Sequence, residues 1–226
     1  MVPSENGRIK IERARLLARK FPESSHLLET YIQITQLQEE IAAGKLKELR
    51  QCFSRLRALP LPEPLASFPL NEDLMETEPQ TPEARFFLRV LMQPHAERHR
   101  RPPSEPYGGT CPSCGQKPVA GVMRGEGDGA KRALVCSMCA LEWPYRRLIC
   151  PNCGEEDKEK LPIYTAAQID HVRVEACDTC RTYIKSVDLT KDGFAVPQVD
   201  EIATVVLNLW ADERGYGKVE TNILGM

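Results

Sequence analysis

The first sixty residues carry apolar positions at helical spacing, which predicts three amphipathic helices. The first is predicted to end before Phe21, with one face formed by Ile9, Arg13, Leu16 and Leu17. The second is predicted to begin at Ser24 or Ser25 and to end at Gly44, with a stripe formed by Leu27, Tyr31, Ile34, Leu37 and Ile41. The third presents Leu46, Leu49, Phe53 and Leu56 on one side. Such stripes favour helix-on-helix packing in a core, with a partner-binding surface as the alternative.

Proline interrupts this pattern between residues 60 and 82. Six prolines in that stretch exclude a continuous helix. A fourth helix is predicted from Glu83 to about Arg100, where Pro94 is expected to kink or end it. The sequence RPPSEPYGG at residues 101–109 then predicts a hinge between two parts of the chain.

Beyond residue 110 the pattern changes to short β-like runs separated by turns. Strands are predicted at Val119–Met123, Ala133–Val135, Arg147–Ile149, His171–Ala176 and Tyr183–Asp188. The glycine-rich residues 125–129 predict a hairpin loop. A last helix is predicted from about Asp200 to Gly215, with one face formed by Ile202, Val205, Val206 and Leu209.

Eight of the nine cysteines lie in this second half, in four CxxC pairs: Cys111/Cys114, Cys136/Cys139, Cys150/Cys153 and Cys177/Cys180. CPSCG and CPNCG open two copies of one unit, and a further CxxC closes each copy. Because four thiolates suit one tetrahedral ion, we expect two mononuclear metal sites, one in the first two pairs and one in the last two. An interleaved fold, in which the first and third pairs share a metal, is the alternative.

The residues around the cysteines support metal binding. A glycine follows each opening pair, at Gly115 and Gly154, where it permits a left-handed backbone. Ala140 and Arg181 follow the closing pairs, so we expect those turns to be looser or shaped differently. Each unit is too short for a core of its own, so metal binding would stabilise its fold. Zinc and iron both suit four thiolates, and a closed site leaves no open position for metal-assisted hydrolysis.

Other interpretations and other candidate residues have weaker support in the sequence. Four CxxC pairs without a βαβ pattern argue against a thioredoxin-like dithiol, while disulfide sensing through metal release stays an alternative. Cys52 is predicted to be a buried small hydrophobe, and His171 is only a weak substitute ligand. Trp143 and Trp210 are predicted to pack. The sequence contains no Ser-His-Asp arrangement, P-loop or GxGxxG motif, and we predict that the protein is not an enzyme.

Charge and hydropathy exclude two further classes. Residues 1–110 contain 16 Lys and Arg against 15 Asp and Glu, and residues 111–226 contain 14 against 17. No clustered basic footprint for nucleic acid is present in the cysteine-bearing half. No apolar run is long enough to span a bilayer, so membrane insertion is not expected. The polar N-terminus lacks the apolar core of a secretory signal peptide, so we expect the cytoplasm, where thiols stay reduced.

With these motifs, the chain resembles the formate dehydrogenase accessory proteins of the FdhE type. The resemblance rests on CPSCGQKPVAGVM (111–123), LVCSMCALEWPYRRLICPNCG (134–154), VEACDTCRTYIKSVD (174–188) and VDEIATVVLNLWADERGYG (199–217). The stretch from Arg13 to Ala42 is similar to the family's early helical segment, more weakly. The helical region, about 100 residues, looks shorter than in the family, which leaves the client and its binding mode open.

The resemblance implies an α+β protein. It has an N-terminal helical domain (1–100), a hinge (101–110), two tandem rubredoxin-like, zinc-ribbon-type four-cysteine metal modules (111–149 and 150–197), and a C-terminal helix with its tail (198–226). The eight paired cysteines would hold two metal ions, iron by family expectation or zinc.

The resemblance also implies a cytoplasmic maturation factor. Such a factor binds the catalytic subunit of a respiratory formate dehydrogenase and assists its assembly, without being that enzyme. A rubredoxin-like electron-transfer protein and a zinc-ribbon binding protein are the alternatives. The sequence leaves the oligomeric state open, a homo-oligomer included.

Overall fold

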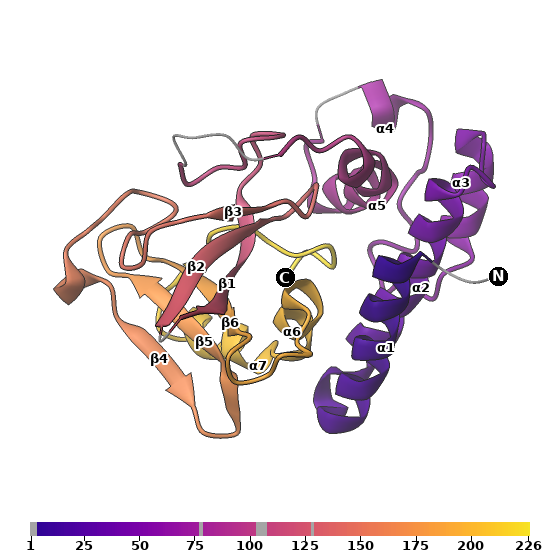
Figure 1. The fold of residues 1–226 in the computed structure, drawn as a ribbon. Coiled ribbons are helices and arrows are strands. Elements are labelled where there is room, and N and C mark those ends of the chain that lie inside the picture. Colours follow the sequence, from indigo (N-terminus) through magenta and orange to yellow (C-terminus); the bar gives the residue numbers. More distant parts are fainter. Residues whose placement is uncertain (1–3, 77–78, 103–107, 128) are drawn as a thin grey trace.

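The protein combines a layer of helices with one mixed β-sheet (Figure 1). The computed structural model describes residues 4–76, 79–102, 108–127 and 129–226. The helices are α1 (Glu5–Lys20), α2 (Ser25–Ala42), α3 (Leu49–Arg57), α4 (Asp73–Glu76), α5 (Pro82–Arg98), α6 (Pro197–Ala203) and α7 (Val206–Asp212). The strands are β1 (Pro118–Glu126), β2 (Gly129–Cys136), β3 (Glu142–Pro144), β4 (Ile163–Ala166), β5 (Ile169–Cys177), β6 (Thr182–Asp188) and β7 (Gly217–Lys218). The predicted α+β class, with helices first and the cysteine-bearing sheet after them, is confirmed.

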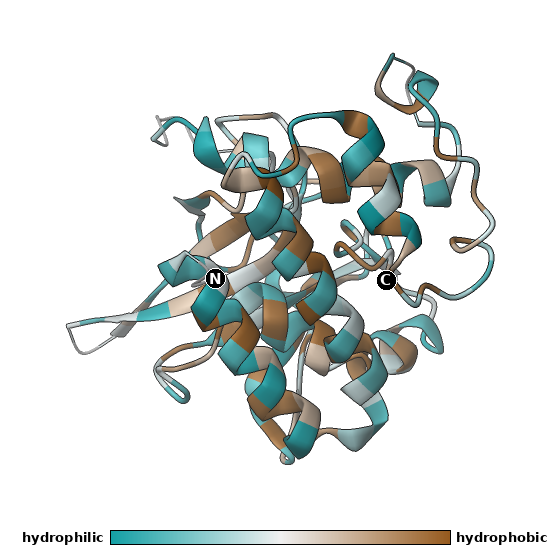
Figure 2. Cartoon of the chain, turned by 90° about the vertical axis from the view of Figure 1, so that its right-hand side faces the viewer, coloured by the Kyte–Doolittle hydropathy of each residue, from teal (hydrophilic) through white to brown (hydrophobic). Residues whose placement is uncertain are grey.

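The N-terminal helices pack on one another, as their apolar stripes predict. Their buried side chains include Leu17, Leu28, Ile34, Leu37 and Phe87. Figure 2 looks at this layer from its outer side and shows hydrophilic and hydrophobic residues alternating along the helices. The same core continues into the C-terminal half, where it takes in Val172, Val187 and Val199. The helical layer and one face of the sheet therefore share a core.

The buried face of α1 differs from the predicted one. Ile9 and Leu16 are 45% and 49% exposed, while the charged residues Lys10 and Arg13 are buried. Lys10 Nζ lies 3.0 Å from Glu97 of α5, and Arg13 Nε donates to Asp200 of α6 at 3.0 Å. These ion pairs turn the charged positions of α1 inward, because each cation has its partner on another element.

Helix α5 runs through Pro94 to Arg98, so the alternative that Pro94 ends the helix is wrong. Proline cannot donate to the carbonyl one turn earlier, which is that of Val90. Gln38 Nε2 of α2 donates to this oxygen at 3.1 Å and so replaces the missing bond.

The sheet is built from two three-stranded units in the same order. The strand order is β3-β2-β1-β6-β5-β4, and β7 pairs with β6. Within each unit, an antiparallel hairpin (β1-β2 or β4-β5) is followed by a third strand, β3 or β6. A parallel pairing of β1 with β6 joins the units into one sheet. The internal repeat that the cysteine spacing indicates is therefore also a repeat of strand topology.

Four of the five predicted strands are present, as β1, β2, β5 and β6, and the β1-β2 hairpin has its turn at the predicted loop. The strand predicted at Arg147–Ile149 is wrong, because that segment is a turn leading to Cys150. The short strands β3 and β4 were not predicted. Of the predicted hinge, residues 103–107 lie outside the described residues, and the domain boundaries stay predictions.

The predicted last helix is split into α6 and α7. Lys185 Nζ of β6 donates to the carbonyl oxygens of Glu201 and Thr204, at the point where the helix is interrupted, and the Thr204 carbonyl also accepts from the N–H of Leu207 at 3.0 Å. The chain bends at Thr204, so Val206 and Leu209 of α7 face outward, 43% and 62% exposed. Only Ile202 of the predicted face is fully buried.

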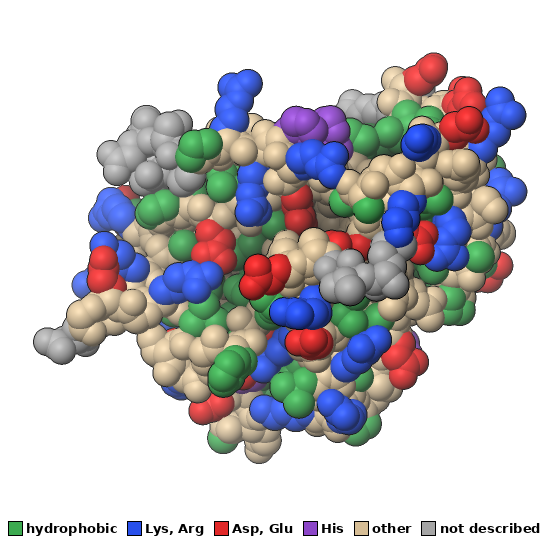
Figure 3. All heavy atoms as spheres, turned by 45° about the vertical axis from the view of Figure 1, so that its right-hand side comes forward, with side chains coloured by type: hydrophobic (Ala, Val, Ile, Leu, Met, Phe, Trp, Pro, Cys, Tyr) green, Lys and Arg blue, Asp and Glu red, His purple; other side chains and the backbone are tan. Residues whose placement is uncertain are grey.

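Lys, Arg, Asp and Glu side chains are mixed over the face drawn in Figure 3, without a continuous basic area. This agrees with the nearly balanced charges of the sequence. Among the described helices, none has the length and apolar character that crossing a membrane requires.

Candidate metal centres

The first group of four cysteines lies at one end of the first three-stranded unit. Cys111 and Cys114 form the turn before β1, Cys136 is the last residue of β2, and Cys139 follows it. The Sγ atoms of Cys111 and Cys139 are 3.5 Å apart, and those of Cys114 and Cys136 are 3.4 Å apart. All four sulfurs lie within 4.8 Å of one another.

The second group repeats this arrangement. Cys150 and Cys153 form the opening turn, Cys177 ends β5, and Cys180 precedes β6. The Sγ distances are 3.7 Å between Cys150 and Cys180 and 3.7 Å between Cys153 and Cys177. The four sulfurs again lie within 4.8 Å of one another. The structure therefore groups the cysteines in tandem and not in the interleaved arrangement.

The sulfur spacing suits a shared metal ion. A tetrahedral ion with bonds of about 2.3 Å to sulfur requires sulfur atoms about 3.8 Å apart. A disulfide requires about 2.05 Å, well below every distance given above. Both groups therefore have the geometry of a four-thiolate site, and both can hold a zinc or an iron ion.

The closing turns have the same backbone shape as the opening ones, contrary to the prediction. Gly115 and Gly154 have φ of 75° and 78°, as expected. Ala140 and Arg181 occupy the corresponding places with φ of 52° and 55°. The turn geometry is imposed on non-glycine residues here, because the sulfurs must point at a common centre while the next strand departs.

Backbone N–H groups surround the sulfurs and favour their ionised form. Cys136 Sγ accepts from the N–H groups of Met138 and Cys139, at 3.3 and 3.4 Å. In the second group, Cys150 Sγ accepts from the N–H of Asn152 at 3.4 Å. Such N–H groups partly offset the negative charge of thiolates.

Each group contains one thiol of low pKa even before a metal is considered. The hydrogen bond with Cys136 lowers the pKa of Cys139 to about 5. Burial opposes ionisation of Cys180, but hydrogen bonds with Thr182, Asn152 and two cysteines of the same group lower the pKa of Cys180 to about 6. Burial raises the pKa of Cys177 to about 12. A positive ion is therefore what would allow all four sulfurs of a group to ionise together.

The two groups are buried unevenly. Cys111, Cys136, Cys139, Cys150 and Cys177 are buried, whereas Cys114 and Cys153, the second cysteines of the opening turns, are exposed. Each centre thus lies near the surface, with the second cysteine of its opening turn exposed.

Side chains around α5 tie the first group to the helical layer. Gln93 Nε2 donates to the carbonyl of Ser137 at 2.8 Å. Arg100, beyond the end of α5, donates to the carbonyls of Cys139 and Ala140 at 3.3 and 3.2 Å. The closing turn of this group is therefore held from outside the sheet as well as by its own strands.

The remaining candidates have structural roles in the described part of the chain. Cys52 is 6% exposed in the helical core, where burial raises its pKa. Trp143 is fully buried, and its Nε1 donates to the carbonyl of Gly108 at 3.0 Å. His171 Nε2 lies 2.9 Å from Asp200 Oδ1, and His171 belongs to neither four-cysteine group, so it is not placed as a substitute ligand.

His171, Asp192 and Asp200 also lie close enough to suggest a metal group. Arg13 Nη2, however, binds both carboxylates, at 2.7 Å from Asp192 Oδ2. The guanidinium supplies the positive charge at this place, so we treat the group as an ion-pair cluster.

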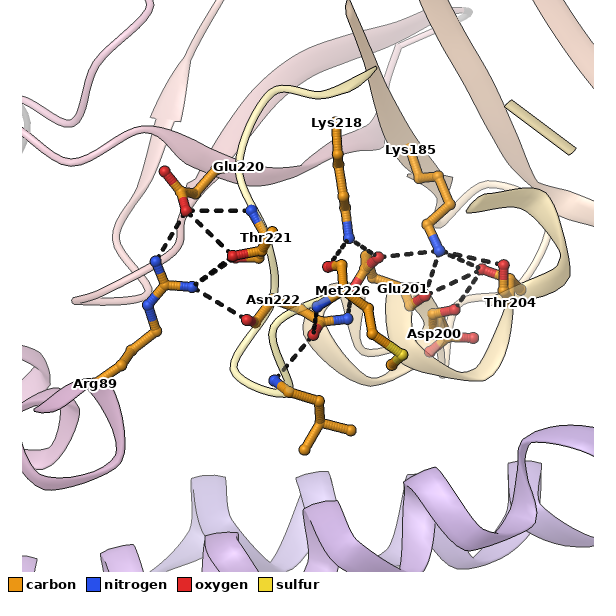
Figure 4. A network of polar contacts seen from close by, with 11 residues as sticks. Arg89, Lys185, Asp200, Glu201, Thr204, Lys218, Glu220, Thr221, Asn222 and Met226 are labelled. Carbon is orange, nitrogen blue, oxygen red and sulfur yellow. Dashed lines mark hydrogen bonds and ion pairs between the residues drawn. The ribbon is translucent and has the colours of Figure 1, made fainter. Parts of the chain in front are cut away.

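Figure 4 shows a second cluster of buried charges, around Glu201, which the sequence did not predict. Glu201 of α6 is fully buried, 3.0 Å from Lys185 Nζ, and also bonded to Lys218 and Asn222. Burial lowers the pKa of Lys185 to about 8. Despite its burial, the two lysines bring the pKa of Glu201 down to about 2. Glu201 is one charged position within an apolar helix face, and its partners are distant in sequence, so no local pattern marks it.

The same figure shows how the C-terminal segment is held. Arg89 of α5 bonds Glu220 at 2.8 Å and donates to the carbonyls of Thr221 and Asn222 at 2.7 and 3.1 Å. Lys218 Nζ donates to the carbonyl of Met226 at 2.8 Å. The segment after β7 therefore joins α5, α6 and the sheet.

Two family models match the cysteine-bearing half end to end. The model "FdhE, central domain" matches residues 110–147, and "FdhE, C-terminal domain" matches residues 148–224. Their boundary falls between the two cysteine groups.

Individual relatives agree with these models. A "Protein FdhE homolog" of Aquifex aeolicus is 39% identical over 146 residues, covering 62% of this chain and 52% of that protein. The homologs of Haemophilus influenzae and Stutzerimonas stutzeri are 33% and 36% identical, over 50% of this chain and 37% of each protein. The chain thus matches about half of the first relative and less of the others.

The crystal structure of the FdhE protein from Pseudomonas aeruginosa has the same fold. Its TM-score is 0.67 at 22% identity, over 96% of this chain and 94% of that chain. The similarity of fold therefore extends to the helices that the family models do not match.

Proposed function

Since the chain belongs to the FdhE family, we propose that it is an accessory protein of formate dehydrogenase maturation that binds the immature catalytic subunit. The observation that carries this proposal is the pair of complete four-cysteine groups on one continuous sheet. They lie in the two regions matched by the family models.

The metal ligands in this proposal are the eight paired cysteines. Cys111, Cys114, Cys136 and Cys139 hold one ion, and Cys150, Cys153, Cys177 and Cys180 hold the other. Four thiolates saturate a tetrahedral ion, so the metals stabilise the turns and, where they are iron, supply one-electron redox chemistry. Iron is the family expectation. The same closure leaves no open coordination position for hydrolysis at the metal, which supports a non-enzymatic role.

The protein acts in the cytoplasm, where its thiols stay reduced and where an exported enzyme is assembled. In this proposal the protein provides a rigid binding surface for the immature catalytic subunit. The shared sheet and the contacts of Gln93 and Arg100 with the first group fix both metal centres relative to the helical layer.

Anaerobic affinity capture of the tagged protein from its native cells tests this proposal. We expect the catalytic subunit of a formate dehydrogenase among the captured proteins. Cys111→Ser and Cys150→Ser should each reduce its recovery, whereas Cys52→Ser, a change outside both groups, should not. Capture of transcription or redox proteins in its place would overturn the proposal.

Exposure of Cys114 and Cys153 favours a second candidate, an electron-transfer protein of the rubredoxin kind. Electron transfer requires iron near the surface and reversible reduction. Protein purified without air that contains only zinc would remove this candidate and leave the accessory role intact.

A further inference from the structure

A groove lies beside the second cysteine group, between the sheet and the turn that leads to Cys150. Its cavity volume is 110 Å³, and Leu148, Leu161 and Ile184 contribute to its lining. Leu148 has a left-handed backbone, with φ of 55°, and is 40% exposed. A leucine in this conformation is strained, and such strain is concentrated at sites that bind.

Of the described residues that line the groove, three are arginines and one, Glu175, carries a carboxylate. Glu175 is shared, at 2.7 Å from Arg132 and 2.7 Å from Arg173. The buried Nε of Arg132 has no hydrogen-bond partner, and Arg147 has no ion-pair partner within the described ranges. Cys150 and Cys177 also line the groove, and as thiolates they would offset its excess of arginines, so Arg147 can act on a ligand only through a local ion pair and not through a net charge of the groove.

The groove continues to β4, the outermost strand at this end of the sheet among the described residues, which lies far from α1–α3 in Figure 1. The N–H of Ala176 donates to the carbonyl of Pro162, and the register pairs Tyr164 with Val174. In an antiparallel ladder the residues between these pairs, Ile163 and Thr165, direct their N–H and C=O groups away from β5. Both are exposed, and Ile163 also lines the groove.

The opposite face of this edge is apolar as well. The rings of Tyr164 in β4 and Trp210 in α7 lie 4.6 Å apart between centroids. Both rings pack against a buried cluster that contains Val174 and Tyr183. A strand added beside β4 would therefore find apolar side chains on both of its faces, with unpaired backbone groups between them.

We propose that an extended segment of the client's catalytic subunit adds to the edge of β4. It places one large apolar side chain in the groove and a carboxylate beside Arg147. This inference rests on the proposed function and names the surface through which it acts. The groove is too small for a folded element but fits a side chain of an added strand, and Arg147 selects an acidic neighbour.

The test is the affinity of the metal-loaded full chain for the purified immature catalytic subunit, measured anaerobically by biolayer interferometry. Thr165→Pro removes one outward N–H and is sterically suited to an edge strand, whereas Thr165→Val keeps the N–H. Ile163→Asp is matched by Ile9→Asp on α1, since the two isoleucines are 44% and 45% exposed. Arg147→Glu is matched by Arg146→Glu, an exposed neighbour that does not line the groove.

We expect Thr165→Pro, Ile163→Asp and Arg147→Glu each to raise the Kd about tenfold, and the matched controls to change it by less than about twofold. Metal content and melting temperature identify any variant that is misfolded. A photoreactive p-benzoylphenylalanine at position 163, but not at position 9, should crosslink to the subunit.

The outcomes separate the two proposals. If wild type binds the subunit and the three groove variants bind it equally well, the groove inference is overturned while the accessory function stands. If the wild-type protein does not bind the subunit, the proposed function is overturned. The inference about the groove is then overturned as well, because the subunit is the partner it names.

Discussion

Gly121 and Ser186 face each other across the parallel seam between β1 and β6, where a Cβ on Gly121 would lie 2.2 Å from Ser186 Oγ. This seam joins the two cysteine-bearing units into one sheet. The close approach of the strands therefore depends on the missing side chain of Gly121.

Gly121→Ala should consequently destabilise the protein by about 1–3 kcal/mol, because the added methyl group overpacks the seam. Gly125→Ala, in the same strand, meets only Thr190 Cγ2 at 3.7 Å and should change stability little. Urea unfolding of both variants measures the difference. Adding Ser186→Ala to Gly121→Ala should restore part of the loss, and an equal loss in all three variants would contradict the steric explanation.

The tandem grouping of the cysteines predicts how metal is lost. Cys111→Ser with Cys136→Ser removes two ligands of the first group and none of the second. This double variant should therefore bind about one metal ion per chain, where wild type binds two. The interleaved arrangement would place one substitution in each site and abolish both. Elemental analysis of protein purified without air distinguishes the two results.

The left-handed backbone after each CxxC pair predicts opposite changes in stability for an alanine introduced there and for a glycine introduced there. At Gly115, φ is 75° and no atom of the described residues lies within 4 Å of an added Cβ, so Gly115→Ala introduces backbone strain without a clash there. We expect it to cost about 1–2 kcal/mol. Ala140→Gly removes the same kind of strain and should be neutral or stabilising. Melting temperatures of the metal-loaded variants report both effects, and stabilisation by Gly115→Ala would contradict the assigned turn geometry.

The buried Glu201 predicts a pH-dependent contribution to stability. Glu201→Gln leaves Lys185 without its carboxylate and should cost about 3–5 kcal/mol at pH 7. The pKa of Glu201 is lowered from 4.5 to about 2, so its stabilising effect is complete above pH 4.5 and is lost as pH falls toward 2. The difference between variant and wild type should shrink over that window.

Urea midpoints of the two proteins at several pH values measure this difference. The comparison cancels the release of metal from protonated thiols, which acid causes in both. Glu213→Gln, an exposed change, is the control and should follow wild type throughout. A difference that stays constant down to pH 2 would show that Glu201 is not ionised in the folded protein.

Local patterns in the sequence were sufficient for the parts of the fold that depend on neighbouring residues. The residues of each CxxC turn, and those of the β-branched runs of β5 and β6, lie within a few positions of one another. The predicted strands β5 and β6 and the left-handed backbone of Gly115 and Gly154 are confirmed. The strands β3 and β4 have three and four residues, too few to show alternation, and they were missed.

The rest depends on contacts between distant residues. Pairing of β1 with β6 joins positions more than sixty residues apart, and no local pattern encodes it. The same holds for Lys185, whose bonds to Glu201 and Thr204 lie where the last helix is divided. It also holds for Arg13, whose pairing with Asp200 turns a charged face of α1 inward. For the candidate metal centres, the grouping of the cysteines followed from their spacing, while the left-handed backbone after all four pairs did not.

The most direct test of the accessory role is formate dehydrogenase activity in native cells that lack this protein. The account predicts that activity falls, that the wild-type gene restores it, and that a gene carrying Cys111→Ser and Cys150→Ser does not. The purified protein should itself oxidise no formate. Unchanged activity without the protein, or full restoration by the double variant, would contradict the account.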